Sequence, residues 1–420
     1  MWIAPTLLVL APLALAPAQQ SQTQTTAERA VALAQGGDCE AALPLLDAAI
    51  EAAPDDVVLR RWRGHCRNLL EEYIGALADY DRALVLDDTD PWTHYARAMS
   101  LHSLGRLREA VDGYGAAIER SPDYLKAVQW RAFTHMLLGE YRDALRDYDR
   151  ALQIAPGDAW TIENRAQVKL RLRDFDGAAH DYSLLTAAYP DDSLYRLYHA
   201  LALTLTGHRD RAWQDFGRLL EVDPDAEGYA ALWRWWVDRD RERAERELTL
   251  WREGRDGWEA LLADVMLGQG SIDAVEAHRL AQPEIQQPAL ACERDFYHGL
   301  ALRSAGESER AIHALEAAIA SNSRASWEWD AARIELGSLA DALGRRSSLG
   351  FTLDPGGVVT TAGPVAAGVG LEVGDQVVAP APAVLAEREA DYGAGQVLTL
   401  EIRRGDRAVT VEVPVIVARG

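Results

Sequence analysis

Apolar and small residues recur along the first half of the chain at a step of 34 positions. The step is visible in three segments: "YIGALADYDRALVLDD" from Tyr73, "LREAVDGYGAAIERSP" from Leu107 and "YRDALRDYDRALQIAP" from Tyr141. One row of the pattern holds only alanine, at Ala42, Ala76, Ala110, Ala144, Ala178 and Ala212. A second row holds large residues, at Leu46, Tyr80, Tyr114, Tyr148, Tyr182 and Phe216. Rows that persist over six units predict a repeat architecture, because a single unit cannot bury its apolar face without neighbours.

Each unit is predicted to be a hairpin of two helices. Residues four positions apart share a helix face, so each large residue fills the gap between its own hairpin and the next. Small residues early in each unit let the two helices approach closely, and these are Ala30, Gly64, Ala98, Ala132, Ala166 and Ala200. The turn between the helices is expected near Gly37, Gly105, Gly139 and Gly207. Prolines such as Pro122 and Pro156 are expected to end the second helix.

These rows resemble the tetratricopeptide repeat (TPR), and the resemblance covers residues 23–226. It implies a mostly α fold, a TPR α-solenoid with six repeats over residues 19–226. Residues 227–291 are rich in Trp and keep no clear 34-residue step, so we expect degenerate helical hairpins there. The segment "ACERDFYHGLALRSAGESERAIHALEAAIASNS" restores the pattern. Residues 292–346 are therefore predicted to hold a seventh TPR-like repeat and a closing helix.

The later helical segments carry a second resemblance. The block from "WEALLADVMLGQGSIDAV" through "CERDFYHGLALRSAGESERAIHALEAAIA" to "WEWDAARIEL" is similar to the C-terminal half of NlpI-like TPR lipoproteins of Gram-negative envelopes. The lipid-anchor Cys of that family has no counterpart here. The resemblance implies a partner among envelope proteases or peptidoglycan enzymes.

The TPR resemblance also implies a binding surface. In such an array the second, fifth, ninth and twelfth positions of each first helix share one face, which lines a concave groove. In the third to fifth units these positions hold Trp92, Tyr95, Met99, His102, Lys126, Gln129, Phe133, Met136, Trp160, Glu163 and Gln167. Aromatic residues and Met at positions that repeat packing does not require predict an apolar or extended polypeptide ligand. The alternative is that neighbouring helices or the Trp-rich block cover these side chains.

The pattern changes to that of a small strand-rich domain from residue 347 onward. "LGFTLD", "GGVVTTA" and "VLTLEIRRGDRAVTVEVPVIV" alternate or run in β-branched residues, and Gly and Pro interrupt them. "RRGDR", residues 403–407, is typical of a hairpin turn, and residues 383–392 are predicted to be helical. The pattern therefore predicts a domain of mixed α/β or β-barrel type over residues 347–420.

Two segments of this domain resemble bacterial PDZ domains. "GPVAAGVGLEVGDQVV" matches their small-residue helical turn followed by Gly-Leu-x-x-Gly-Asp and a strand, and "SLGF" matches their carboxylate-binding loop. The resemblance implies a PDZ-like β-barrel that holds a peptide's C-terminus, which adds a strand to the sheet edge. It implies a peptide site at Ser348, Leu349, Gly350, Phe351 and Thr352 of the loop and strand, and at Ala383, Ala386 and Glu387 of the helix. The alternative is a PDZ fold kept for docking without peptide binding.

The N-terminus and the net charge bear on location and partners. The first eighteen residues, "MWIAPTLLVLAPLALAPA", are apolar and end in an A-x-A form that a signal peptidase reads. We expect residues 1–18 to be a cleaved signal peptide and the mature chain to be periplasmic or secreted. No second apolar run of membrane length follows, so no membrane span is predicted in the mature chain. The net charge of −22, without a run of Lys and Arg, argues against a nucleic-acid partner.

The three cysteines allow two interpretations. Cys39 and Cys66 fall on neighbouring predicted helices, and an exported chain is free to form a disulfide between them. The other interpretation is that all three, with Cys292, are small buried hydrophobic residues. No cysteine pair or histidine cluster has the spacing of a metal site, so no metal is predicted.

Catalytic motifs are absent from the sequence. It contains no G-x-S-x-G, no H-E-x-x-H and no phosphate-binding glycine loop. We therefore predict no catalytic residue and no cofactor. The leading hypothesis is an exported, non-enzymatic adaptor whose TPR groove binds one polypeptide and whose PDZ domain binds a C-terminal peptide or a partner. The alternative is an accessory or regulatory subunit of an envelope protease or peptidoglycan enzyme.

Overall fold

The computed structural model describes residues 17–222, 227–238, 240–321, 323, 326–343, 347–348, 351–353, 358–368, 371–380, 385, 396–404 and 407–417. The chain divides into two compact units, Met1–Asp174 and Phe175–Gly420. The division falls within the predicted repeats. Residues 1–16 of the predicted signal peptide lie outside the described residues. The first described helix begins at Pro17.

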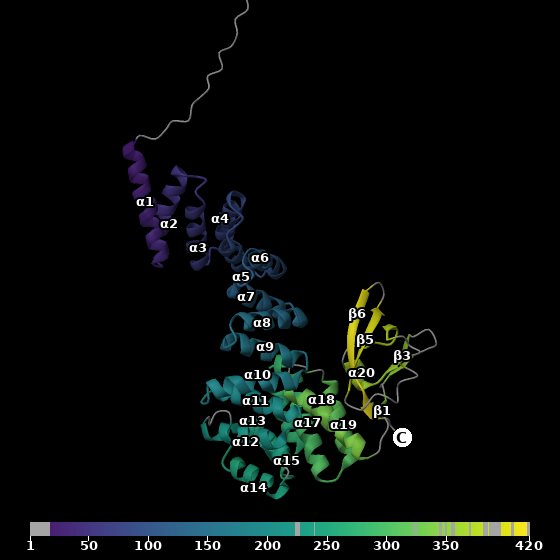
Figure 1. Ribbon diagram of the computed structural model, residues 1–420. Coiled ribbons are helices and arrows are strands. Elements are labelled where there is room, and N and C mark those ends of the chain that lie inside the picture. The colour runs from purple at the N-terminus through teal and green to yellow at the C-terminus, as the bar shows by residue number, and fades with distance from the viewer. Residues whose placement is uncertain are drawn as a thin grey trace, which may run out of the picture. The chain divides into compact units, whose positions relative to one another are not determined.

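The first unit consists of helices in which each contacts the next, as Figure 1 shows. They are α1 (Pro17–Gln35), α2 (Cys39–Ala52), α3 (Val57–Leu69), α4 (Tyr73–Leu86), α5 (Pro91–Ser103), α6 (Leu107–Arg120), α7 (Leu125–Leu137), α8 (Tyr141–Ile154) and α9 (Ala159–Arg171). The pairs α1–α2, α3–α4, α5–α6 and α7–α8 are the predicted hairpins. The predicted mostly helical repeat fold is therefore confirmed.

The two residue rows of the sequence form the centre of the helical packing. Every alanine of the first row has no exposed surface, and the same holds for the large residues of the second row. Gly64 shows why small residues recur between them. A Cβ atom at Gly64 would lie 2.9 Å from the Tyr80 ring, closer than real Cβ contacts allow. The small residue on the first helix thus leaves the space that the tyrosine of the second helix fills.

The turns inside the hairpins need a left-handed residue at the same step of 34. Gly105 and Gly139 adopt φ values of 72° and 75°, which glycine reaches without a steric cost. Glu71 occupies the same place in its own unit with φ 63°. A side chain at this φ costs about 1 kcal/mol.

Glu71→Gly is therefore expected to raise the free energy of unfolding of the first unit by about 0.5–1 kcal/mol, because glycine relieves the backbone strain. The glutamate side chain that is removed is exposed to solvent. Urea denaturation followed by far-UV circular dichroism measures the change. The reverse substitution, Gly105→Glu, should destabilise by a similar amount or more. Equal midpoints for both variants would contradict this account of the turn.

A row of arginines follows the repeat as well, and sequence analysis did not identify it. Arg63, Arg97, Arg131 and Arg165 lie 34 positions apart on the first helices of their units. Each pairs with an aspartate sixteen positions away on an adjacent helix: Asp79 and Asp47 for Arg63, Asp81 for Arg97, Asp147 for Arg131 and Asp149 for Arg165. The row joins consecutive helices by charge-assisted hydrogen bonds.

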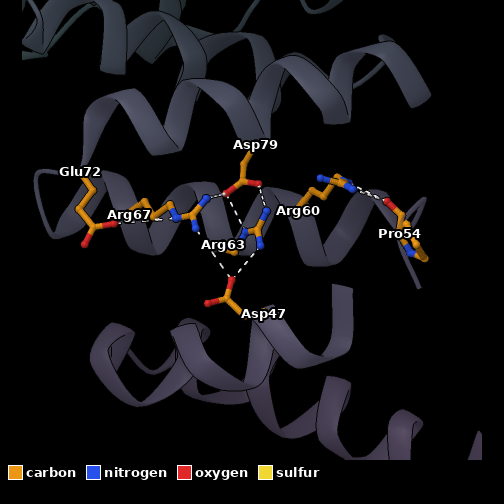
Figure 2. Close-up of polar contacts among 7 residues, drawn as sticks. All are labelled: Asp47, Pro54, Arg60, Arg63, Arg67, Glu72 and Asp79. Carbon is orange, nitrogen blue, oxygen red and sulfur yellow. Dashed lines mark hydrogen bonds and ion pairs between the residues drawn. The ribbon is translucent and has the colours of Figure 1, made fainter. Parts of the chain in front are cut away.

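Asp79 is the most buried aspartate of this row. Its carboxylate is 1 % exposed and accepts hydrogen bonds from Arg63 Nε at 2.9 Å and Arg67 Nη1 at 2.7 Å. Figure 2 shows Arg63 between Asp79 of α4 and Asp47 of α2, so that one guanidinium links three helices. Asp79 thus pairs with two arginines that are themselves mostly buried.

The second unit continues with helices and ends in strands. Its helices are α10 (Phe175–Ala188), α11 (Ser193–Leu205), α12 (Arg209–Val222), α13 (Glu227–Val237), α14 (Arg241–Arg252), α15 (Trp258–Met266), α16 (Ile272–Leu280), α17 (Gln287–Ser304), α18 (Ser308–Ala320), α19 (Trp327–Ala342) and α20 (Pro364–Gly368), with the short turn η2 (Glu284–Gln286) before α17. Trp233 and Trp236 of α13 are buried against Phe296 of α17, with ring centroids 6.1 and 5.4 Å apart. These indoles fill the core where the 34-residue step is lost.

The described strands form three small antiparallel sheets. They are β1 (Ser347–Ser348) with β7 (Ile416–Val417), β2 (Phe351–Leu353) with β3 (Val359–Ala362), and β4 (Gln376–Ala379) with β5 (Val397–Arg404) and β6 (Arg407–Pro414). The hairpin expected at residues 403–407 is present, because Arg404 pairs with Arg407. A closed barrel was also expected, but the described strands do not form one. Among the described residues, the β2–β3 pair meets the larger sheet through the bridge between Val358 and Gln376 and through backbone hydrogen bonds of Val359 with Gly374 and Asp375.

Buried apolar residues and one ion pair hold these strands together. Leu371, Val377, Leu400 and Val413 belong to a single apolar cluster. Asp375, in the segment that resembles PDZ domains, is 2 % exposed and accepts hydrogen bonds from Arg404 Nε at 2.7 Å and Nη2 at 2.6 Å. The Arg404 guanidinium lowers the pKa of Asp375. The aspartate of "LEVGDQVV" therefore fixes the start of β4 to the end of β5.

Candidate functional site

Four aromatic rings from three successive first helices lie in contact. His102 comes from α5, Trp130 and Phe133 from α7, and Trp160 from α9. The ring centroids of His102 and Phe133 are 6.0 Å apart, and the same distance separates Phe133 from Trp160. Trp130 contacts each of the other three rings. We call this group the aromatic cluster; it contains three of the predicted groove residues and spans three repeats.

A smaller group of rings lies nearer the N-terminus of the same unit. Trp92 of α5 contacts Trp62 and His65 of α3, with centroid distances of 6.4 and 5.8 Å. It also rests edge-on against the buried ring of Tyr80. Trp92 was predicted as a groove residue. The structure places it next to Trp62 and His65, which were not among the predicted groove residues.

The aromatic cluster is partly open to solvent and carries no formal charge at neutral pH. The Trp160 side chain is 38 % exposed, whereas Trp130 and Phe133 are half-buried. Burial lowers the pKa of His102, and it lowers the pKa of His65 in the smaller group as well. Both imidazoles are therefore neutral at pH 7. Such a surface suits an apolar or aromatic segment of a partner better than a charged one.

The remaining predicted groove residues are placed differently. Tyr95 packs between helices, 5.3 Å from Tyr124 and 5.9 Å from Tyr114, and Met99 accepts a hydrogen bond from the Tyr114 hydroxyl. Gln129 is buried and donates to Asp158 and Thr161 at the start of α9. Met136 packs against the apolar core, Lys126 is exposed, and Gln167 donates to Glu163 at 3.4 Å.

The choice of the second, fifth, ninth and twelfth positions of each first helix thus combined two kinds of residue. Some of its positions hold side chains that pack between helices, whereas His102, Phe133 and Trp160 meet in the aromatic cluster. The rule missed Trp130 and Trp62, which lie at equivalent positions two repeat steps apart. The recurrence of tryptophan along that row of the sequence could have identified both.

The predicted PDZ peptide site is only partly described. Ser348 lies in β1, and Phe351 and Thr352 lie in β2. Phe351 is 8 % exposed and belongs to the apolar cluster of the strands, so its side chain contributes to the core. The other residues of this prediction lie outside the described residues, and these are Leu349, Gly350, Ala383, Ala386 and Glu387.

The structure brings Cys39 and Cys66 together. Both are buried members of one apolar cluster, and no bond joins their sulfur atoms in the structure. Burial, with the hydrogen bond between the two side chains, raises the pKa of Cys66 to about 12. The disulfide between them stays a prediction, and Cys292 is a third buried thiol.

One group of side chains has the composition of a metal site. Ligand atoms of His135, Glu140 and Asp143 lie within 4.8 Å of one another at the turn between α7 and α8. Glu140 is already engaged, since its two oxygens pair with His135 at 2.7 Å and with Arg108 at 3.1 Å. We interpret the group as a polar network, because Glu140 already pairs with Arg108 of α6 as well as with His135.

A buried acidic residue in the second unit has a perturbed protonation equilibrium. Glu293 of α17 accepts hydrogen bonds from Trp258 Nε1 at 2.7 Å and from the Tyr229 hydroxyl at 2.9 Å. Burial, and next the negative charge of Glu328, raise the pKa of Glu293 to about 7. Glu259 adds to the same effect from α15.

Glu293→Gln is expected to remove a pH dependence of stability. The folded chain holds this proton more tightly than the unfolded chain, so the stabilisation is complete below about pH 4.5 and is lost as the pH rises through about 7. The melting temperature of the variant should therefore gain on that of the wild type between about pH 5 and pH 8. Glu284→Gln, at an exposed position of η2, is the control. A constant difference between Glu293→Gln and wild type over this range would contradict the assignment.

None of the described helices is both long enough and apolar enough to cross a bilayer.

Comparisons with known proteins agree with the helical part of the fold. Models of the tetratricopeptide repeat match residues 28–91 and 126–158. Among solved structures, the chain is similar to YrrB, described as a TPR protein with an unusual peptide-binding site, at 18 % identity and TM-score 0.40 over 43 % of this chain and 94 % of YrrB. It is similar to Pseudomonas aeruginosa pilF at 16 % identity and TM-score 0.41, over 50 % of this chain and 95 % of that one. No curated protein matches the sequence.

The matched ranges set the limit of what the comparisons establish. The chain contains tetratricopeptide repeats, which generally serve as non-enzymatic scaffolds for protein–protein interaction. Neither matched range reaches residues 347–420, so the PDZ resemblance stays a prediction.

Proposed function

We propose that this chain, whose first unit is built from tetratricopeptide repeats, is an exported scaffold that binds an apolar segment of a partner polypeptide. The observation that carries the proposal is the aromatic cluster, in which Trp160 is 38 % exposed beside Phe133 and Trp130. Aromatic side chains supply large contact areas at a small cost in conformational entropy, and they are the residues that most often dominate binding energy.

The physical character of the cluster restricts the ligand. Its histidine is neutral at pH 7, and its other members are two indoles and a phenyl ring. The chain as a whole has a net charge of −22, so a strongly acidic partner would be repelled. A segment with one or two apolar or aromatic anchors therefore fits the surface best.

The second part of the proposal concerns the tail. Its resemblance to PDZ domains supports binding of a C-terminal peptide, and the helical turn α20 followed by β4 follows the expected order of elements. The resemblance of the later helices to NlpI-like proteins supports an envelope protease or peptidoglycan enzyme as the partner. In this form the protein is periplasmic or secreted. The second candidate is an accessory or regulatory subunit of such an enzyme, with the tail contacting the enzyme surface.

A capture experiment with matched variants tests both parts. The mature chain from Gln19 is immobilised and compared with a triple variant, Trp92→Ala with Phe133→Ala and Trp160→Ala, and with a chain that ends at Arg346. Ile74→Ala, which removes an exposed apolar side chain from α4, is the control. Partners from envelope extract that are lost with the triple variant but kept by the control support the aromatic cluster together with the smaller group around Trp92. Partners lost only with the shortened chain support the tail.

Two outcomes would contradict the proposal. If the triple variant folds, as judged by its circular dichroism spectrum, and retains every partner of the wild type, the aromatic cluster is not the binding surface. Cleavage of casein by the purified chain without any added protease would contradict the non-enzymatic assignment.

A further inference from the structure

A cavity of about 320 Å³ in the second unit gathers several arginines that belong to no predicted site. It is lined by Arg209 of α12, Trp235 and Trp236 of α13, Arg241 of α14, Leu300, Arg303 and Ser304 of α17, and Glu335 of α19. These helices are far apart in the sequence, so the folded unit alone brings the residues together. The volume is that of a pocket for a small ligand or a single side group.

The charges in this cavity do not balance. Three guanidinium groups face one carboxylate, in a chain whose net charge is −22. Glu335 is buried and already fully used: its Oε1 accepts from Trp236 Nε1 at 2.8 Å and from Arg209 Nη2 at 3.0 Å, and its other oxygen pairs with Arg303. The carboxylate therefore cannot neutralise a third cation.

Arg241 is that third cation. Its guanidinium lies over the Trp235 ring, 4.1 Å from the centroid, and donates to the Trp235 carbonyl oxygen at 3.2 Å. Within the described part of the chain, no carboxylate forms an ion pair with it. Burial lowers the pKa of Arg303, and the charges of Arg209 and Arg241 lower it further. The three guanidinium groups thus act on one another across the cavity.

The geometry points to an oxyanion-binding site. We propose that this cavity binds a phosphate or carboxylate group, held between Arg241, Arg303 and Arg209 over the indoles of Trp235 and Trp236. The planar fork of arginine matches the oxygens of both groups in a bidentate way. Trp235 and Trp236 are 2 % and 3 % exposed, so they form an apolar floor, whereas about a third of the Arg209 and Arg303 side chains remains exposed.

A purely structural explanation accounts for only part of the arrangement. The Arg209–Glu335–Arg303 group would by itself join α12, α17 and α19. Adding Arg241 introduces repulsion with Arg209. It gains a ring contact, a single hydrogen bond to a carbonyl and the attraction of Asp238 and Glu245, neither of which forms an ion pair with it. An anion that entered the cavity would turn this excess of positive charge into an attraction.

Isothermal titration calorimetry of the full mature chain at low ionic strength tests the proposal. Three probes separate the sources of the anion: inorganic phosphate, an apolar tetrapeptide with a free terminal carboxylate, and the same peptide with an amidated terminus. We expect binding of phosphate or of the free-carboxylate peptide. Arg241→Gln should weaken it about tenfold to a hundredfold, the value of one charge-assisted hydrogen-bonded contact.

The control variant is Arg246→Gln, on the same helix but exposed and paired loosely with Glu242 at 3.7 Å. It makes the same change in net charge and should leave binding within about twofold. Arg241→Lys keeps the charge without the planar fork and should give an intermediate affinity. Binding that is lost on amidation identifies the carboxylate as the source, and binding of phosphate alone identifies a free anion.

Two results would overturn the proposal. One is the absence of binding heat for all three probes with the wild-type chain. The other is equal affinity for Arg241→Gln and Arg246→Gln. Melting temperatures without ligand give an independent check, because removing one of three mutually repelling cations should leave the melting temperature unchanged or higher. A clear loss for Arg241→Gln, without any effect of phosphate on wild type, would assign the arginine a structural role.

Discussion

Asp79→Ala is expected to lower the free energy of unfolding of the first unit by about 3–5 kcal/mol, the usual cost of removing one partner from a buried ion pair. The carboxylate is 1 % exposed and receives hydrogen bonds from both Arg63 and Arg67. Its removal leaves Arg67 with no carboxylate closer than 3.9 Å and leaves Arg63 with the half-exposed Asp47. The cost is therefore mostly that of two poorly compensated charges in a packed interface.

A matched control lies two residues away on the same helix. Asp81 pairs with Arg97, but its side chain is 55 % exposed. Asp81→Ala should cost no more than about 1 kcal/mol, because water screens an exposed pair. Urea denaturation followed by circular dichroism compares the two, and equal losses would contradict the role given to burial. In a further variant, Arg63 and Arg67 are also replaced by Met, and part of the stability should return because no uncompensated charge remains.

The arginine row shows how much of the helix packing was predictable from the sequence. The step of 34 that revealed the alanine and tyrosine rows also contains the arginine row, so its existence was predictable. Its partners were predictable where only one carboxylate lies sixteen positions away. Arg97 has Asp81 behind it and Gly113 ahead, whereas Arg131 has Asp147 ahead and Gly115 behind. Arg63 has Asp47 behind it and Asp79 ahead, and only the packed helices show that Asp79 is the buried one.

The candidate site was predictable in part for a related reason. Helix periodicity placed Phe133 and Trp160 on one face, and the structure brings their rings together. It could not distinguish them from Gln129, whose amide is buried against the start of α9. That distinction depends on how far each first helix is rotated toward the next. The arginine cavity was beyond any such rule, since residues between 209 and 335 meet there without a repeat step.

Core packing and the exposed aromatic cluster meet at Tyr148. The tyrosine ring is fully buried among Ala132, Ala144 and Val168. It also contacts the Trp160 ring edge to face, with a centroid distance of 6.1 Å. Its hydroxyl has no hydrogen-bond partner among the described residues. The residue therefore contributes through the volume of its ring, and burial of the unpaired hydroxyl costs stability.

Tyr148→Ala is expected to destabilise the first unit by about 3–5 kcal/mol, because it removes a large buried ring and leaves a cavity between two hairpins. Tyr148→Phe keeps the ring and should match the wild type or exceed it by up to about 1 kcal/mol. Urea midpoints measure both. Repeat units are stabilised mainly by their nearest neighbours, so the alanine variant should also uncouple the hairpins on either side and broaden the transition.

The same two variants connect stability with the proposed function. At a temperature where Tyr148→Ala is still folded, its capture of partners should fall as it does for Trp160→Ala, because the indole loses the ring on which it rests. Tyr148→Phe should bind as the wild type does. Full binding by a folded Tyr148→Ala chain would show that Trp160 needs no support from the core. The aromatic cluster would then be a surface whose geometry the partner itself imposes, and the rigid repeat beneath it would serve stability alone.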